Sequence, residues 1–174
     1  MGYDDGSAGD ANYGSIGRGY ADYRQPEPYI AERILAALGN AESVLNLGAG
    51  AGSYEPVDRL VTAVEPSETM RAQRPDYLSR ALEGSAESLP FEDNYFDAAM
   101  ATFTVHQWQD LESGLAEMRR VARGPVAILS CDPVLLDRFW LAEYAPTVIA
   151  TEARRYPDPA RIAAILGNAR IEPV

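Results

Sequence analysis

The sequence predicts an α/β fold in which helices cover both faces of a mostly parallel sheet. Short apolar runs rich in Val, Leu and Ala alternate along the chain with segments whose apolar residues recur at helical spacing. The first run, "SVLNLG" at residues 43–48, leads directly into three glycines at alternate positions, Gly48, Gly50 and Gly52. A glycine-rich turn after a buried strand is typical of ligand-binding α/β folds.

Composition supports one ordinary folded domain. The chain has 174 residues, of which 47% are hydrophobic and 24% are charged. Its net charge is −11, and it has no cluster of Lys and Arg with which to neutralise phosphates, so we expect no nucleic-acid partner. A single cysteine, Cys131, excludes an internal disulfide. No apolar run approaches the ~20 residues of a membrane helix, and the N-terminus lacks a signal-peptide pattern. We therefore expect a cytoplasmic protein without a membrane partner.

The N-terminal region differs in composition from the rest of the chain. Residues 1–19 are rich in Gly, Asp, Ser and Tyr and carry little apolar material, which predicts a flexible arm. Aromatic residues then recur beside Arg18 and Arg24, a pattern that also suits a lid or a packed arm. We expect residues 20–174 to form a single domain.

The first half of this domain predicts two helices and three strands. An apolar stripe over residues 28–40 predicts a helix that ends at a Gly-Asn pair. Buried strands are predicted over 43–48 and 59–66. The connection between these strands is short and leaves room for about one or two helical turns. A short helix with Ser67 as its N-cap follows, and residues 80–86 form a weak third strand.

The second half continues the alternation. Strands are predicted over 95–105 and 124–131, and between them residues 111–123 form an amphipathic helix. Residues 135–144 favour a helix, which places Phe139 and Trp140 either in the core or over a pocket.

The last predicted helix covers residues 158–168, with Asp158 as its cap, Pro159 in its first turn and Gly167 as its stop. Residues 169–174 begin like a strand.

Three kinds of ligand fit the glycines to different degrees. A phosphate loop needs a Lys after the last glycine, whereas Gly52 is followed by Ser-Tyr-Glu, so we reject it. A dinucleotide site needs an acid at the end of the next strand, and Glu65 provides one, but the third glycine stands one place early. A nucleoside ligand without a pyrophosphate also fits. Two carboxylate oxygens of Glu65 can accept from a ribose diol, and the N-terminus of a following helix would favour a ligand carboxylate. S-adenosylmethionine combines these groups, and the glycines alone leave the last two alternatives open.

The order and spacing of five blocks extend the comparison beyond the glycines. Together they resemble the class I S-adenosylmethionine-dependent methyltransferases, in the small-molecule branch whose domain is called methyltransferase type 11. The blocks are "VLNLGAGAGSYEP", "VTAVEPSETM", "GSAESLPFEDNYFD", "MATFTVHQW" and "MRRVARGPVAIL". The resemblance covers about residues 13–131. It implies a Rossmann-like sheet with a reversed final strand, and transfer of a methyl group from S-adenosylmethionine to a small-molecule acceptor, with S-adenosylhomocysteine as the product.

The resemblance also implies roles for individual residues. The glycines pass under the methionine part of the cofactor, Glu65 grips the ribose, and Thr102 lies where the methyl group is presented. The other cofactor-binding residues that it implies are Tyr20 and Arg24 in an N-terminal segment over the cofactor, Pro66 and Met70 beside the adenine, and Ser85 and Ala86 in the loop at the adenine edge. Arg24 would pair with the carboxylate of the cofactor.

Three departures from the family pattern bear on the site and the fold. Asn46 stands where the superfamily often has an acid, and an amide still donates and accepts, so we expect it to bind the cofactor. Ser85 stands where the adenine loop often has Asp. The resemblance implies further strands after residue 131, and the chain stops within the first of them, so the C-terminal strands are expected to be missing. An open edge would then favour a homodimer.

The implied chemistry needs few catalytic groups. A sulfonium methyl is already activated, so alignment is the main requirement, and a base is needed only for an acceptor that must lose a proton. His106, the sole histidine, follows a predicted strand and is the candidate base or substrate contact, with helix capping or packing against Trp108 as the alternative. Trp108, Tyr13 and Tyr20 are candidates for a cation–π contact with the sulfonium. No metal site is predicted.

Two other functions remain as hypotheses. The chain would bind S-adenosylmethionine or S-adenosylhomocysteine without catalysis if the missing strands remove the acceptor site. A nicotinamide-dependent oxidoreductase is the weaker alternative, because the third glycine is misplaced and the adenine-loop block is present.

Overall fold

The computed structural model describes residues 26–167 and 169–174. The predicted arm over residues 1–19 and two candidate cofactor residues, Tyr20 and Arg24, therefore lie outside the described residues, as does Tyr13. The predictions for them are unchanged by the structure.

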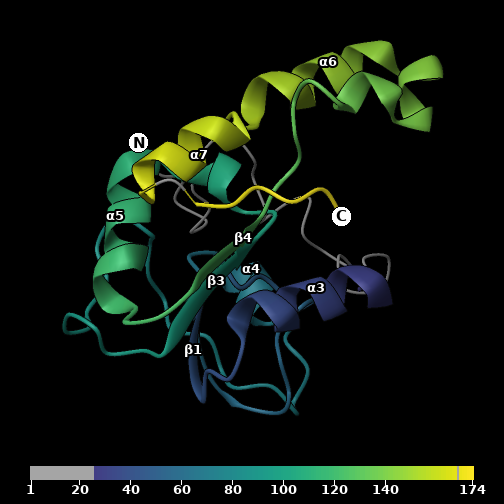
Figure 1. The fold of residues 1–174 in the computed structure, drawn as a ribbon. Helices are drawn as coiled ribbons and strands as arrows, with labels where there is room; N and C mark the ends of the chain where they lie inside the picture. Colours follow the sequence, from purple (N-terminus) through teal and green to yellow (C-terminus); the bar gives the residue numbers. More distant parts are fainter. Residues whose placement is uncertain (1–25, 168) are drawn as a thin grey trace.

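Four parallel strands form the sheet, in the order β2-β1-β3-β4. Figure 1 shows β1, β3 and β4 of this sheet. Their bounds are β1 Ser43–Leu47, β2 Leu60–Val64, β3 Ala98–Thr102 and β4 Val126–Leu129. The central strands β1 and β3 pair from Val44 opposite Ala98 to Asn46 opposite Met100. All four strands were predicted, and the parallel pairing brings their carboxyl ends to one edge of the sheet.

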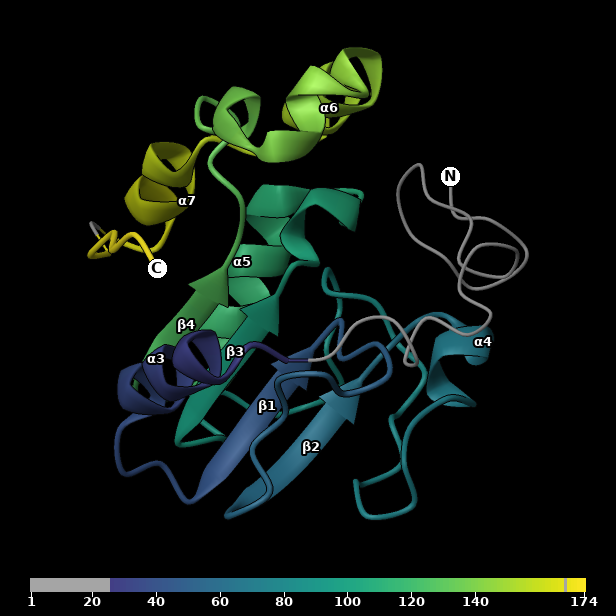
Figure 2. The same ribbon diagram turned by 90° about the vertical axis from the view of Figure 1, so that its right-hand side faces the viewer.

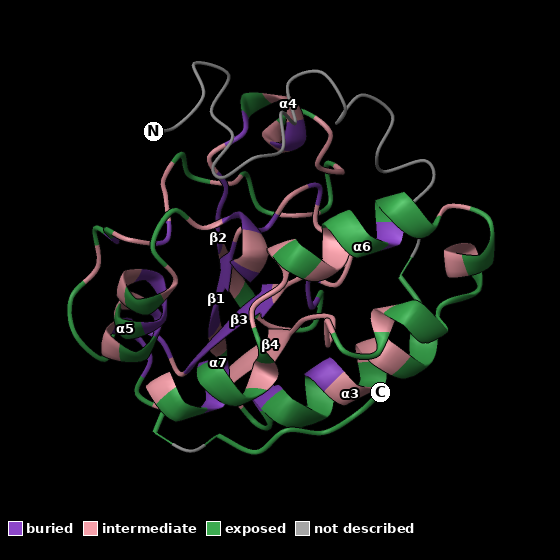
Figure 3. Cartoon of the chain, turned by 90° about the horizontal axis from the view of Figure 1, so that it is seen from above, coloured by how far each residue is buried: buried purple, intermediate pink, exposed green. Residues whose placement is uncertain are grey.

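Helices cover both faces of this sheet, as predicted (Figure 2). Helix α3, Pro28–Leu38, packs its buried Ile34 and Leu38 on one face. Helix α5, Leu111–Val121, and helix α7, Pro159–Ile165, cover the other face. Because strand residues point alternately to the two faces and both faces are covered, the central strands are buried along their length, which is visible as purple strands in Figure 3.

Local sequence explains where the predicted helices begin. The Glu27 carboxylate accepts from the amide of Ile30 and so caps α3. Asp158 caps α7 by accepting from the amide of Ala160, as predicted. Helix α4, Glu68–Arg71, begins at Ser67, whose hydroxyl accepts from the amide of Met70 at 3.4 Å. Each cap satisfies an amide that has no partner inside its own helix.

Three predicted elements do not form. Residues 48–59 contain no helix between β1 and β2, so there is no helix N-terminus there to bind an anion. The weak third strand is reduced to a single parallel bridge between Val64 and Leu82. Residues 169–174 form no strand, although an ion pair joins Glu172 to Arg33 on α3. In the segment predicted as the third strand, the hydrogen bonds to β2 are those of Leu82, whose amide donates to Ala63 and whose carbonyl oxygen accepts from Glu65.

The segment between β4 and α7 also differs from the prediction. Instead of one helix over 135–144, it contains two short 3-10 helices, η2 Leu136–Arg138 and η3 Trp140–Glu143, and then α6, Pro146–Arg155. Phe139 and Trp140 are 47% and 65% exposed, so they are not in the core. The segment stands beyond the carboxyl ends of the strands and is mostly exposed (Figures 2 and 3).

Candidate functional site

A cavity of about 310 Å³ opens at the carboxyl edge of the sheet, where β1, β2 and β3 end. Its volume is within the range of small-molecule sites in proteins. Eight of the residues that the sequence assigned to the cofactor line it: Gly48, Gly50, Glu65, Pro66, Met70, Ser85, Ala86 and Thr102. The strand ends and the loops after them thus converge on one space, as the α/β topology requires.

The glycine loop, defined here as residues 48–55, turns sharply after β1. The φ angles of Gly48, Gly50 and Gly52 are +66°, +52° and +92°, a region that residues with a side chain rarely adopt. A Cβ at Gly48 would lie 2.1 Å from the hydroxyl oxygen of Thr104, and one at Gly52 would lie 2.3 Å from Leu78. Two of the three glycines are therefore required by close packing against other parts of the chain as well as by the turn.

Glu65 is the acidic group of the cavity. Its side chain is almost fully buried, and its two oxygens accept from the amides of Gly50 at 2.8 Å and Ser67 at 2.9 Å. Burial raises the pKa of the Glu65 carboxyl, while those two hydrogen bonds and the charges of Arg71 and Arg74 act in the opposite direction. The two amides fix the orientation of the carboxylate and leave each oxygen with acceptor capacity toward the cavity.

Helix α4 and the loop over residues 83–87 shape one side of the cavity. Met70 is buried on α4, and Ala86 is buried in the loop. The Arg71 guanidinium donates to the carbonyl oxygens of Glu65 and Pro66, at 2.8 and 2.7 Å, and so holds the turn between β2 and α4. The predicted adenine-side residues are thereby brought together with the predicted ribose acid.

Four further residues that line the cavity were not predicted from the sequence to contact the ligand. Tyr54 comes from the glycine loop, Phe103 and Thr104 follow β3, and Gln107 comes from the 3-10 helix η1, Val105–Gln107. Phe103 has a positive φ of +52°, and its amide donates to Leu129 on β4. Because Phe103 and Thr104 directly follow a buried strand, their position in the sequence could have indicated that they line the site. No comparable pattern in the sequence indicates Tyr54.

Two further residues that line the cavity are an aromatic candidate, Trp108, and a carboxylate, Glu87. Trp108, one of the aromatic candidates for a sulfonium contact, lines the cavity. Glu87 also lines it, and its carboxylate accepts from the amides of Gln109 and Asp110. Among the described residues that line the cavity, the only charged ones are Glu65 and Glu87, so the space favours a ligand that carries positive charge.

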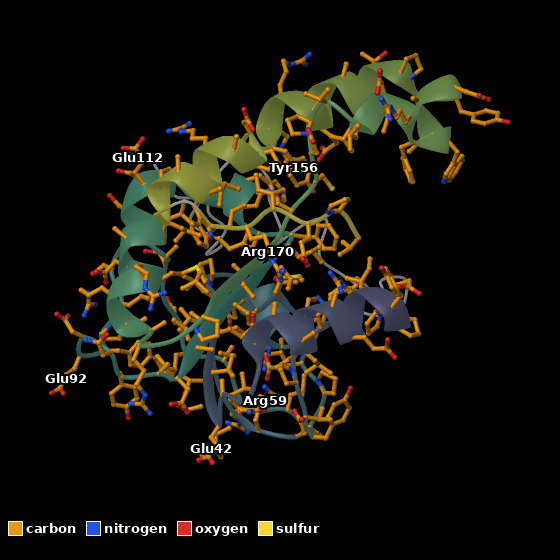
Figure 4. All side chains as sticks on the ribbon, in the orientation of Figure 1. Glu42, Arg59, Glu92, Glu112, Tyr156 and Arg170 are labelled. Carbon is orange, nitrogen blue, oxygen red and sulfur yellow. The ribbon has the colours of Figure 1, made fainter. Side chains whose placement is uncertain are left out.

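Three of the predicted site residues do not line the cavity. The Asn46 amide nitrogen donates to Glu55 at 2.8 Å, and Gly52 packs against Leu78. His106 lies on η1 with its ring 4.2 Å from that of Tyr156, which Figure 4 shows at the junction of α6 and α7. Their predicted roles stay predictions, and none of the three residues is placed where it would contact a ligand in this cavity. Phe139 and Trp140 do not line it either.

The described residues offer neither a metal site nor a membrane span. Within residues 26–167 and 169–174, no group of three or more His, Cys, Asp or Glu is arranged to hold a metal ion. No helix among the described residues is both long and apolar enough to cross a membrane.

Known proteins share this arrangement. Residues 45–127 match the sequence profile of a family described as "Methyltransferase domain", of type 11. The chain is 33% identical over 121 residues to a malonyl-[acyl-carrier protein] O-methyltransferase of Erwinia pyrifoliae. The aligned part covers 65% of this chain and 46% of that protein. The chain is also 47% identical over 51 residues to the ubiquinone/menaquinone biosynthesis C-methyltransferase UbiE of Burkholderia mallei. That aligned part covers 28% of this chain and 21% of that protein.

A solved structure extends the likeness to the fold. A putative methyltransferase from an antibiotic biosynthesis pathway of Anabaena variabilis superposes with a TM-score of 0.73 at 28% identity, over 82% of this chain and 61% of that one. The chain thus spans less than two thirds of the length of each of these relatives. Sequence profile and fold agree with each other and with the position of the glycine loop and Glu65, and the chain belongs to the class I S-adenosylmethionine-dependent methyltransferases, in the type 11 branch.

Proposed function

We propose that this protein transfers a methyl group from S-adenosylmethionine to a small-molecule acceptor. The observation that carries the proposal is the position of the Glu65 carboxylate inside the cavity, oriented by the amides of Gly50 and Ser67. The family uses S-adenosylmethionine as its cofactor, and the cavity fits its parts. Glu65 can accept from a ribose diol, Met70 and Ala86 give the apolar wall that an adenine needs, and the acidic lining suits a sulfonium.

When bound, the cofactor supplies a methyl group that a sulfonium has already activated, so the protein's own residues mainly bind, align and exclude water. Thr102, Phe103 and Trp108 line the cavity at the end of β3 and beyond it, and we assign them to the acceptor.

His106 is not needed as a base in this proposal. Its ring packs against Tyr156 and it does not line the cavity, so we assign it a packing role under the segment that contains α6. Two of the relatives named above methylate an oxygen and a carbon, respectively, according to their names. An acceptor screen for this protein therefore includes both kinds of atom.

Calorimetric titration of the 174-residue chain with S-adenosylhomocysteine tests the proposal first. We expect binding with a dissociation constant in the micromolar range, and no binding of NADH in the same buffer. NADH binding in the absence of S-adenosylhomocysteine binding would replace the proposal with the oxidoreductase hypothesis. S-adenosylhomocysteine binding without turnover of any screened acceptor would favour the non-catalytic binding protein.

Two further proposals concern the assembly and its place in the cell. In the described part of the chain, β4 has β3 as its one strand neighbour, and we propose that this edge forms a homodimer. Sedimentation that shows only monomers up to high concentration would contradict the dimer. We also propose a cytoplasmic location and a single domain over residues 20–174, to be tested by cell fractionation and limited proteolysis.

A further inference from the structure

A buried ion pair lies next to the glycine loop and outside the cavity. One nitrogen of the Arg74 guanidinium contacts both carboxylate oxygens of Glu55, at 2.7 and 2.8 Å. The side chains of Arg74 and Glu55 are only 3% and 1% exposed. The Asn46 amide donates to the same Glu55 carboxylate. None of these three residues lines the cavity, so none of them is assigned to the ligand by position.

The pair joins parts of the chain that are separate in sequence. Glu55 ends the glycine loop, Asn46 precedes it in β1, and Arg74 follows α4. Arg74 also donates to the carbonyl oxygen of Ser79 at 2.9 Å and approaches that of Gly50 at 3.5 Å. One guanidinium thus contacts the middle and the end of the loop and the segment after α4, using the several donors that only arginine offers in a planar fork.

The two backbone polar groups of Gly50, which belong to the peptide planes before and after it, both have partners. Its amide donates to the Glu65 carboxylate in the cavity, and its carbonyl oxygen faces Arg74. Three glycines with positive φ give the loop many alternative conformations in the absence of side-chain contacts. A buried ion pair is weak as a source of net stability because both charges lose their hydration. A positional role explains the pair better than a stabilising one.

We propose that Arg74, Glu55 and Asn46 are positioning residues that hold the glycine loop in its cofactor-binding conformation before the ligand arrives. This inference rests on the proposed function. It also accounts for Asn46 at a position where the superfamily often has an acid. The carboxylate is supplied by Glu55 instead, nine residues later, and the amide of Asn46 anchors it. A second carboxylate at position 46 would repel the first.

The double variant Glu55→Met/Arg74→Met separates positioning from stability, because it removes both buried charges together. We expect it to unfold at a temperature close to that of the wild type. Its affinity for S-adenosylhomocysteine should fall about tenfold or more, since a loop that is not preorganised must be ordered on binding. In the ligand-free protein, amide hydrogen exchange should become faster in residues 48–55 and stay unchanged in β3. Wild-type affinity and wild-type exchange in a folded double variant would overturn the proposal.

Arg74→Lys provides a second test that does not depend on how the double variant folds. A lysine keeps the charge beside Glu55 but lacks the fork that also reaches Ser79 and Gly50. We expect weaker S-adenosylhomocysteine binding and faster exchange of the loop. Equal affinity and equal exchange in Arg74→Lys would overturn the proposal.

Arg120→Met is the matched control. Arg120 also makes several contacts, to Glu117, Asp93 and two carbonyl oxygens, but it contacts no residue that lines the cavity. We expect it to lower stability without changing affinity or loop exchange. Titration of the wild type distinguishes failure of the proposed function from failure of the positioning role. A wild type that does not bind S-adenosylhomocysteine contradicts the proposed function, whereas a wild type that binds and variants that bind equally contradict only the positioning role.

Discussion

At the scale of single residues, Glu65 carries the strongest prediction. Glu65→Ala removes the proposed ribose acceptor, and we expect S-adenosylhomocysteine binding to weaken by roughly 1.5–3 kcal/mol, the range for hydrogen bonds to charged groups. Calorimetry measures the change directly. Glu92→Ala is the control, since Glu92 is exposed and does not line the cavity. If the two variants bind equally well, the ribose assignment of Glu65 is wrong.

The ionisation of Glu65 predicts opposite effects of pH on stability and on binding. Burial raises its pKa above the ordinary value of 4.5. A raised pKa means that folding favours the protonated form. The contribution of Glu65 to stability is therefore present below 4.5 and is lost as the pH rises through the folded-state pKa.

Binding needs the ionised carboxylate as an acceptor, so we expect S-adenosylhomocysteine affinity to fall as the pH drops from neutral toward the raised pKa of Glu65. Titrations at a series of pH values measure this fall. Glu65→Ala should show a flatter profile, and a wild-type affinity that does not depend on pH would contradict the prediction.

His106 offers a residue-scale test of packing against catalysis. If it packs under the α6 segment, His106→Ala and Tyr156→Ala should lower turnover to a similar degree and leave cofactor affinity near that of the wild type, because their rings lie 4.2 Å apart. Steady-state kinetics on the first acceptor found would show this. A loss confined to His106→Ala, with a changed pH profile of turnover, would restore the general base predicted from sequence position.

At the scale of elements, the glycine loop depends on its contact with the segment after β3. Thr104 occupies the space where a Cβ of Gly48 would lie, so the loop after β1 and the loop after β3 pack directly on each other. Phe103, with its positive φ, precedes this contact and is held by Leu129 on the next strand. The walls of the cavity are therefore coupled through packing of the Thr104 side chain on the backbone of Gly48, in addition to their separate contacts with a ligand.

Gly48→Ala tests this coupling. We expect a larger loss of stability than the roughly 1–2 kcal/mol that a left-handed conformation costs an L residue, together with loss of S-adenosylhomocysteine binding. Gly167→Ala is the matched control, because Gly167 has a φ of +85° and nothing within 4 Å of an added Cβ. Urea unfolding and calorimetry measure the two effects. Equal destabilisation by both substitutions would show that the contact with Thr104 is easily relieved.

At the scale of the whole molecule, Asp97 joins elements at the edge of the sheet opposite the cavity. Its carboxylate accepts from the amide and hydroxyl of Ser43, from the amide of Glu42, and from Arg123 after α5. Figure 4 shows Glu42 at this lower end of the sheet. The hydrogen bonds from Ser43, followed by those from Arg123, lower the pKa of Asp97 from 3.8 to about 2.

This lowered pKa predicts part of the acid unfolding of the domain. A depressed folded-state pKa means that the contribution of Asp97 to stability is present above 3.8 and is lost as the pH falls toward about 2. Asp97→Asn should therefore be less stable than the wild type at neutral pH, and the difference should shrink across that acid range. Unfolding by urea at several pH values checks the trend. A difference that stays constant with pH would mean that the charge of Asp97 does not contribute.

Most of the elements followed from local patterns. The four main strands, α3, α5 and α7 could be predicted because apolar periodicity and caps such as Asp158 act within a few residues of where they stand. The segment over residues 132–156 could not. Phe139 and Trp140 have the composition of a core, but no sheet face remained for them, and they stay exposed.

The sequence by itself determined the parallel sheet, the glycine loop and the acid after β2, because each depends on residue types at short, regular spacing. It also indicated the family. Only the tertiary structure decided which residues share the cavity. Asn46 turned toward Glu55, His106 lay against Tyr156, and Tyr54 and Phe103 entered the lining. The physical reason is that a side chain's neighbours depend on contacts between residues far apart in sequence, such as Arg74 with Glu55 and Thr104 with Gly48, and no local pattern encodes those contacts.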